Sequence, residues 1–420
     1  MSESPRRGAV VALLVAMVML VGLAAPASAE PSPPSYVAVI DAGSSGTRLT
    51  LYGDDAQSIV PTVVMRVRQS TKGLSSFASS PGQAGPSAVV PLLDELDSFL
   101  KEQGIAKTEV PVALLATAGL RNVRRDDKAA AQAIIDSAAA SISSLGFPIA
   151  DSRILPAVQE ATLAWLDANV LAGTLNREKG SFGIVEIGGA SAQVAFRSPE
   201  KKGTGVYIIR VAKQQIPVVA VSYLGLGSND ARSLMQGAND AGAFCFPNNS
   251  PGQAPTTYVS TSPRPVAADK AQFQWNRCAA AFRAIITEVG SKRTAAAQVT
   301  PSGLRDLAGF NDARFIGLGS IPFEFSDLGI QGAVNKRTAL RGATEATCSG
   351  KDAWRNVLAL FAGRSSAFAD TLCSSGAYQY EFLFGTAGVG VKHRSFTADS
   401  SAFPRDPAWT SGYAVTVLDP

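Results

Sequence analysis

The pattern of apolar and polar positions is most informative just after residue 36. An apolar run from Val37 to Ile40 ends at Asp41, a small turn with two glycines follows, and alternating apolar positions resume at Leu49 and Leu51. Two such runs around a Gly-containing turn predict a β-hairpin. Successive amides in a glycine turn form an anion-binding nest, and a carboxylate at a strand end can hold a metal-bound water.

The same pattern returns between Gly183 and Phe196. An apolar strand again ends in a carboxylate, Glu186, and a second apolar strand follows the turn Gly188-Gly189-Ala190-Ser191. The two acidic positions, 41 and 186, lie about 145 residues apart, which indicates an internal duplication around a phosphate.

The remaining pattern alternates strand-like and helix-like segments. Residues 117–121 are expected to form a small turn with a hydroxyl group, and Glu160 lies near the first turn of a predicted helix that follows Pro156. The alternation predicts an α/β protein. The predicted helices span 89–103, 127–145, 155–170, 230–236 and 273–290, and further strands are predicted at 63–67, 110–116, 206–211, 218–221 and 314–318.

Composition narrows the function classes. The 420 residues are enough for two domains with large cores, and the hydrophobic fraction of 46% is that of an ordinary globular protein. A net charge of +4 is small for this length and does not indicate a nucleic-acid partner. The single histidine, His393, argues against a histidine-based metal site or catalytic triad.

The N-terminal residues 1–29 have the features of a secretory signal peptide. Arg6 and Arg7 precede an apolar run, and Ala27-Ser28-Ala29 supplies the small residues of a cleavage site. The alternative is an uncleaved membrane anchor. Cleavage predicts a secreted or extracytoplasmic protein without stable membrane insertion.

If the protein is exported, its four cysteines are expected to form disulfides. An oxidising compartment favours disulfides, and four cysteines allow three pairings, of which the sequential one closes two loops of moderate length. Free buried thiols are the alternative. The cysteines are Cys245, Cys278, Cys348 and Cys373.

Five segments, in chain order, resemble the signature regions of the apyrases, the family of nucleoside triphosphate diphosphohydrolases. The third is Glu160 with Trp165 and Asn169. The resemblance covers nearly the whole chain after residue 29, and the sequential disulfides Cys245–Cys278 and Cys348–Cys373 also fit soluble members of the family. The other four segments are 41–48, 116–121, 188–193 and, loosely, 315–325.

The resemblance implies a fold as well as an activity. It implies two ribonuclease-H-like lobes of the actin and sugar-kinase superfamily, with phosphates and a divalent metal in the cleft between them. Lobe I would comprise residues 36–163 and about 403–420, and lobe II residues 164–402. The nucleobase would be stacked between aromatic side chains of lobe II, for which Phe323, Trp354, Tyr378 and Tyr380 are candidates.

The implied reaction is hydrolysis of the terminal phosphates of nucleoside tri- and diphosphates, by a water that Glu160 activates. Ser191 and Gln193 would orient that water, and the Thr117 hydroxyl would lie beside the phosphate. Asp41 and Glu186 would hold Mg²⁺ or Ca²⁺ through water, as Mg²⁺ prefers. The implied phosphate-binding residues are Ser44, Ser45, Gly46, Thr47, Ala118, Gly188, Gly189 and Ala190. A monomer is expected.

Two departures from the family pattern keep other functions open. Ala161 follows the base where the family has glycine, and its methyl could crowd the phosphates. Glu186 stands where the family has aspartate, and its extra methylene puts the metal position in doubt. A nucleotide-binding protein without turnover is therefore one alternative. An exopolyphosphatase-like phosphohydrolase, which shares the hairpins and the carboxylate base, is another.

Overall fold

The computed structural model describes residues 35–55, 57–67, 71–237, 244–248, 272–362, 366–398 and 403–418. The signal peptide expected over residues 1–29 lies outside these ranges. Within them, no helix is both long and apolar enough to cross a membrane.

The first hairpin belongs to a sheet that has five strands among the described residues, in the order β3-β2-β1-β4-β5. β1 and β2 are antiparallel, so that Asp41 lies opposite Arg48, and β1 is parallel to β4. The strands are β1 (Tyr36–Ala42), β2 (Thr47–Asp55), β3 (Ser58–Arg66), β4 (Val112–Ala116) and β5 (Ile149–Ile154).

The second hairpin belongs to another sheet, with six strands in the described part of the chain, in the order β11-β10-β6-β7-β9-β8. β6 and β7 are antiparallel, so that Glu186 lies opposite Gln193, and β6 is parallel to β10. The strands are β6 (Phe182–Ile187), β7 (Ser191–Arg197), β8 (Val206–Val211), β9 (Gln214–Leu224), β10 (Arg314–Gly319) and β11 (Phe396–Thr397).

The two sheets repeat one topology. In each, the hairpin is extended by a further antiparallel strand on one side, β3 or β9, and by two parallel strands on the other, β4 with β5 or β10 with β11. The duplication expected from the two acid-tipped hairpins therefore extends to five strands of each sheet, and β8 is an additional antiparallel strand at the edge of the second sheet.

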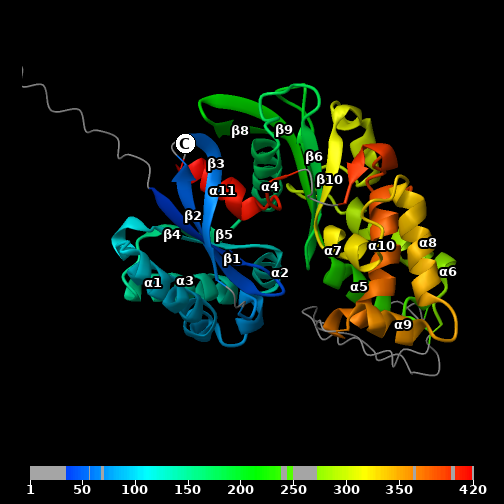
Figure 1. Ribbon diagram of the computed structural model, residues 1–420, viewed down its shortest axis with the longest axis horizontal. Coiled ribbons are helices and arrows are strands. Elements are labelled where there is room, and N and C mark those ends of the chain that lie inside the picture. Colours follow the sequence, from blue (N-terminus) through cyan, green and yellow to red (C-terminus); the bar gives the residue numbers. More distant parts are fainter. Residues whose placement is uncertain are drawn as a thin grey trace, which may run out of the picture. The chain divides into compact units, whose positions relative to one another are not determined.

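The helices cover the sheets and share the cores with them. α1 (Val90–Gln103) and α3 (Lys128–Ser144) bury apolar residues against the first sheet, and Figure 1 shows both on the same face of it. The helices that share a core with the second sheet are α5 (Ser228–Gly237), α6 (Trp275–Ser291), α7 (Ile321–Asp327), α8 (Lys336–Cys348), α9 (Ala353–Leu360) and α10 (Leu372–Phe384).

Two further helices join the sheets within one hydrophobic cluster. α4 (Ala157–Leu171) and α11 (Trp409–Leu418) pack on each other and contribute buried residues such as Trp165 and Val415. The same cluster contains Val39 of the first sheet and Ile184 of the second. The boundary expected between residues 163 and 164 therefore falls inside α4, in a core that both sheets share.

One sequence prediction was wrong in its secondary structure. Residues 117–121 do not form the expected turn, because α2 (Ala118–Asp126) begins directly after Thr117. A Cβ atom on Gly119 would lie 2.9 Å from the Cα atom of Ser44. Glycine is a poor helix former, but here it lets α2 approach the β1–β2 turn, and that contact cannot be read from propensity.

The structure contains two disulfides, Cys245–Cys278 and Cys348–Cys373, which is the sequential pairing. The first bond links Cys245, which precedes α6 in the chain, to Cys278 within α6. The second bond links the end of α8 to the start of α10. No free cysteine remains in the described residues. The first bond ties a non-helical segment to α6 and the second ties α8 to α10, and all four cysteines belong to the core of the second sheet.

Reduction of the disulfides is expected to destabilise the protein. The bonds span 33 and 25 residues, and loops of that length correspond to about 3–4 kcal/mol each in the chain-entropy account. Urea denaturation with and without reductant measures the loss, and Cys278→Ala and Cys348→Ala separate the two bonds. Equal midpoints in the two conditions would contradict the prediction.

Candidate active site

The acidic residue at the tip of each hairpin lies within electrostatic range of Glu160. Asp41 lies near the end of β1, Glu186 lies near the end of β6, and Glu160 lies in the first turn of α4. Burial raises the pKa of Asp41 to about 7; the charge of Arg48 lowers it and the charge of Glu160 raises it. Burial also raises the pKa of Glu186 to about 8, and the charges of Glu160 and Asp41 add to the rise. The fold thus brings three carboxyl groups within electrostatic range.

Arg121, in α2, connects the expected base to the expected water-orienting residues. Its Nη2 atom donates to Oε2 of Glu160 at 2.8 Å and to Oγ of Ser191 at 3.1 Å. Gln193 donates from Nε2 to the same Oγ atom at 2.6 Å. A single guanidinium therefore holds Glu160 and Ser191 side by side, although they come from different elements.

These side chains are shielded from solvent. Glu160 is 7% exposed, Arg121 6%, Ser191 2% and Gln193 1%. Because charge-assisted hydrogen bonds are stronger away from water, the arrangement of the four groups is well defined.

Arg121 is a site residue that the sequence reasoning did not assign. It belongs to the second resembling segment, and a cation directly after a small, hydroxyl-bearing turn is a signal for an anion or a carboxylate partner. Its Nη1 atom also donates to the backbone oxygen of Leu155 at 3.1 Å, which fixes the guanidinium from the other side.

The two glycine turns contact each other. A Cβ atom on Gly189 would collide with Oγ of Ser44, so the second turn approaches the first as closely as glycine permits. Each turn is closed in the same way, by a hydrogen bond of 3.0 Å from Gly43 N to Gly46 O and from Gly188 N to Ser191 O. The phosphate-binding residues expected from the two hairpins are therefore neighbours.

The two threonines expected near the phosphate, Thr117 and Thr47, lie in different surroundings. Thr117 directly precedes α2, and its amide donates to Ala42 O at 3.2 Å, which places it beside the end of β1. The Thr47 hydroxyl instead donates to the backbone oxygen of Lys72 at 2.8 Å, and its side chain is fully buried. Thr47 thus braces the first turn in this structure.

The methyl group of Ala161 is part of the hydrophobic core. Ala161 is fully buried and belongs to the hydrophobic cluster between α4 and α11. Ala161, the first departure from the family pattern, is therefore a core residue.

The site offers oxygen donors that suit a hard cation. Glu186 Oε2 is buried and has no hydrogen-bond partner within the described residues, and Asp41 and Glu186 each face other negative charges. A divalent cation would stabilise the ionised form of both groups. The described residues contain no group of three or more histidine, cysteine, aspartate or glutamate side chains that could hold a metal ion.

Comparison with known proteins identifies the family. A model of the GDA1/CD39 (nucleoside phosphatase) family matches residues 28–419. The chain belongs to this family. The resemblance to the apyrases is confirmed at the level of the family, and the GDA1/CD39 chain is a nucleoside phosphatase.

Individual relatives agree with the family. Ectonucleoside triphosphate diphosphohydrolase 2 of Mus musculus is 25% identical over 450 residues, which cover 97% of this chain and 88% of that protein. A nucleoside-triphosphatase of Pisum sativum is 31% identical over 218 residues, which cover 47% of this chain and 46% of that protein.

A solved structure supports the fold. The nucleoside triphosphate hydrolase from Neospora caninum superimposes with a TM-score of 0.58 at 16% identity, covering 91% of this chain and 92% of that one. Together with the repeated sheet topology, this confirms the predicted α/β fold for this GDA1/CD39 protein.

Proposed function

We propose that this nucleoside phosphatase is a secreted apyrase, which hydrolyses the terminal phosphates of nucleoside tri- and diphosphates with the aid of Mg²⁺ or Ca²⁺. The observation that carries the proposal is the shared Arg121 guanidinium. It holds the Glu160 carboxylate next to Ser191, at the start of the strand that follows the second glycine turn. A base, a water-orienting hydroxyl and two anion-binding turns then meet in one place.

Glu160 acts as the general base in this proposal. Phosphoryl transfer to water requires a group that positions the water and accepts its proton in line with the leaving oxygen. Ser191 and Gln193 would hold the water, since the 2.6 Å hydrogen bond between them fixes both side chains next to Glu160. The bond from Arg121 fixes the orientation of the carboxylate.

The two glycine turns bind the phosphates. Backbone amides of Ser44, Ser45, Gly189 and Ala190 are the proposed donors, and they suit charge that spreads over the phosphoryl oxygens in the transition state. The Thr117 hydroxyl, Gly46, Ala118 and Gly188 lie in the same turns or next to them. Because the turns touch at Ser44 and Gly189, we propose that the phosphates enter as the turns move apart.

Asp41 and Glu186 would hold the divalent cation through its water ligands. The cation would neutralise charge on the phosphate oxygens. The extra methylene of Glu186 is accommodated on β6, where its Oε2 atom is buried without a partner in the described part of the chain.

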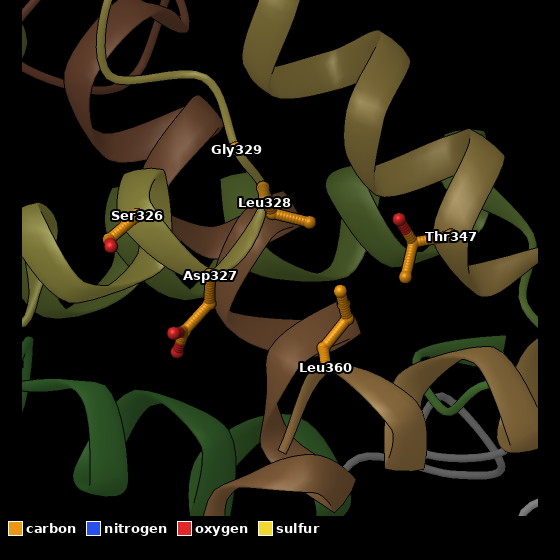
Figure 2. A pocket seen from close by; sticks show the side chains of 6 residues that line it. All are labelled: Ser326, Asp327, Leu328, Gly329, Thr347 and Leu360. Atoms are coloured by element: carbon orange, nitrogen blue, oxygen red, sulfur yellow. The ribbon is translucent and has the colours of Figure 1, made fainter. Parts of the chain in front are cut away.

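The exposed face of α7 is the proposed place for the nucleobase. Phe323 is 72% exposed, whereas Tyr378 is buried and donates to the backbone oxygen of Leu226, so Phe323 is the better stacking candidate. Asp327, one helical turn later on the same face, lines a pocket of about 490 Å³. Figure 2 shows Leu328, Thr347 and Leu360 turned toward the same space.

The length of α7 suits this placement. Ser320, just before the helix, donates from its amide to Ile187 O beside the second glycine turn, at 2.9 Å. The seven residues of α7 then span about 10 Å at a rise of ~1.5 Å per residue. An extended nucleotide could follow the helix from the turn to the pocket.

Secretion and the division into lobes complete the proposal. The signal-peptide pattern of residues 1–29 and the two disulfides both suit an oxidising, extracytoplasmic compartment. Lobe I would contain the first sheet, and α11 returns to pack on β1, which suits the assignment of residues 403–420 to this lobe. Lobe II would contain the second sheet.

Phosphate release tests the proposed function. The protein without residues 1–29 is assayed with ATP, ADP, UDP and polyphosphate, each with Mg²⁺, Ca²⁺ or EDTA. We expect release from the nucleotides with either metal and at least a tenfold loss in EDTA, because the cation neutralises the phosphate oxygens.

The same assay contains the outcomes that would contradict the proposal. Release from polyphosphate alone would favour the exopolyphosphatase-like alternative. No release from any substrate, with nucleotide still bound in a calorimetric titration, would indicate a binding protein.

A further inference from the structure

A hydrogen bond next to Arg121 joins the two halves of the site. Asn122, the next residue of α2, donates from Nδ2 to Oδ2 of Asp230 at 3.1 Å. α2 packs on α3 and β4 of the first sheet, whereas α5, which contains Asp230, packs on α6 and α10 beside the second sheet. The bond therefore connects elements that otherwise belong to separate cores.

Asp230 is an unusual residue for a purely structural contact. It is 5% exposed, and its Oδ1 atom is buried without a hydrogen-bond partner among the described residues. Burial raises its pKa to about 7, while the hydrogen bond from Asn122 and the charge of Arg125 lower it. An apolar residue would cost less at such a position, because a buried carboxylate that is only partly satisfied is destabilising.

The start of α5 is fixed to the second glycine turn. Ser228 N donates to Gly188 O at 2.8 Å and Asn229 N donates to Gly189 O at 2.9 Å. A Cβ atom on Gly227 would collide with backbone atoms of Gly189 and Ala190, so the contact is tight. Asp230 therefore moves with the turn that is proposed to bind phosphate.

Two consecutive residues of α2 thus contact the second half of the site. Arg121 reaches Ser191, and Asn122 reaches Asp230. Consecutive helix residues point about 100° apart, given ~3.6 residues per turn. One contact would leave the helix free to rotate about its axis, whereas two contacts in different directions fix its rotation.

We propose that Asp230, through its hydrogen bond with Asn122, is a positioning residue for the phosphatase reaction. It sets the rotation of α2 relative to the second glycine turn, and so holds the Arg121 guanidinium between Glu160 and Ser191. The proposal rests on the proposed function of that site. The side chain of Asp230 is hydrogen-bonded to Asn122 and not to Glu160.

A charge exchange between the two positions tests the proposal. Asp230→Ala removes the acceptor and is expected to lower kcat about tenfold, the effect of losing one hydrogen bond of roughly average strength. Asn122→Asp sets two carboxylates against each other and should lower kcat further. The double variant N122D/D230N restores an amide–carboxylate hydrogen bond in the reverse direction, and kcat should return to within about threefold of the wild type.

The control is a pair of the same chemistry that stays within one helix. Gln132 donates to Asp136 at 2.9 Å on the exposed face of α3, and Asp136→Ala should leave kcat unchanged. In Asp230→Ala and in the double variant, KM and the melting temperature should change little, because substrate binding and both cores are intact. Losses of kcat that only match losses of folded protein, or a double variant no better than the single ones, would overturn the proposal.

The outcomes also separate this inference from the proposed function. A wild-type protein that releases no phosphate from nucleotides contradicts the proposed function. An active wild type, with all three variants equally active, overturns only the positioning role of Asp230.

Discussion

Replacement of Glu160 by glutamine is expected to lower kcat for nucleotide hydrolysis by about 10²–10⁴-fold, the contribution typical of a general base. An amide cannot accept the proton of the attacking water. KM should change little, since the proposed phosphate donors belong to the two glycine turns. The measurement is steady-state phosphate release from ATP and ADP with saturating metal.

The glutamine variant is designed to leave the fold intact. Its side-chain oxygen can still accept the hydrogen bond that Arg121 donates to Glu160 at 2.8 Å, so the buried guanidinium keeps a partner. A melting curve close to that of the wild type checks this. Alanine would not serve, because it would leave the charge of Arg121 buried and unpaired.

Glu178→Gln is the matched control. Glu178 is exposed and lies in the link before β6, whereas Glu186 lies near the other end of that strand. It should retain wild-type activity. If Glu160→Gln kept activity within tenfold of this control, another group would have to accept the proton, and the proposed mechanism would be wrong.

Replacement of Asp167 by alanine is expected to lower the free energy of unfolding by about 3–5 kcal/mol, the cost typical of breaking a buried ion pair. Asp167 is fully buried in α4 and accepts hydrogen bonds from four donors. These are Arg405 Nη1 at 2.8 Å, Arg405 Nη2 at 2.9 Å, Ala408 N at 2.8 Å and Ser411 Oγ at 2.7 Å.

The large effect follows from what the alanine would leave behind. Arg405, only 16% exposed at its side chain, would keep its charge without the carboxylate, and the start of α11 would lose its main anchor on α4. Since α4 also carries Glu160, activity should fall at temperatures well below the melting point of the wild type.

Urea denaturation measures the loss, with Glu345→Ala as the control. Glu345 pairs with Arg341 at 3.2 Å on the surface of α8, and such exposed pairs contribute about 0.3–0.5 kcal/mol. A change for Asp167→Ala no larger than that of the control would show that the four hydrogen bonds contribute little net stability.

Local patterns determined much of this protein. The hairpins are visible in the sequence because a strand, a glycine turn and a second strand are contiguous, and their contacts span few residues. The amphipathic spacing of α1, with Leu93, Leu96 and Leu100 on its buried face, is equally local. The resembling segments then gave the family and the expected site residues.

Local patterns failed where a distant segment decided the outcome. The helix α2 starts with residues that favour a turn, and only the approach of Ser44 explains Gly119. The sequence left open whether the methyl of Ala161 crowds the phosphates, and in the structure Ala161 belongs to the core in which α11 packs on α4. Neither contact has a signal within a short window of sequence.

The sequence by itself therefore determined the two acid-tipped turns, the alternation of strands and helices and the family, because each depends on residues that are close in the chain. Only the tertiary structure decided that Arg121 joins Glu160 to Ser191, that Asn122 meets Asp230, and that Asp167 binds Arg405 across 238 positions. These contacts form only when elements that are far apart in the chain pack together. Polar partners so far apart do not produce a periodic pattern in the sequence.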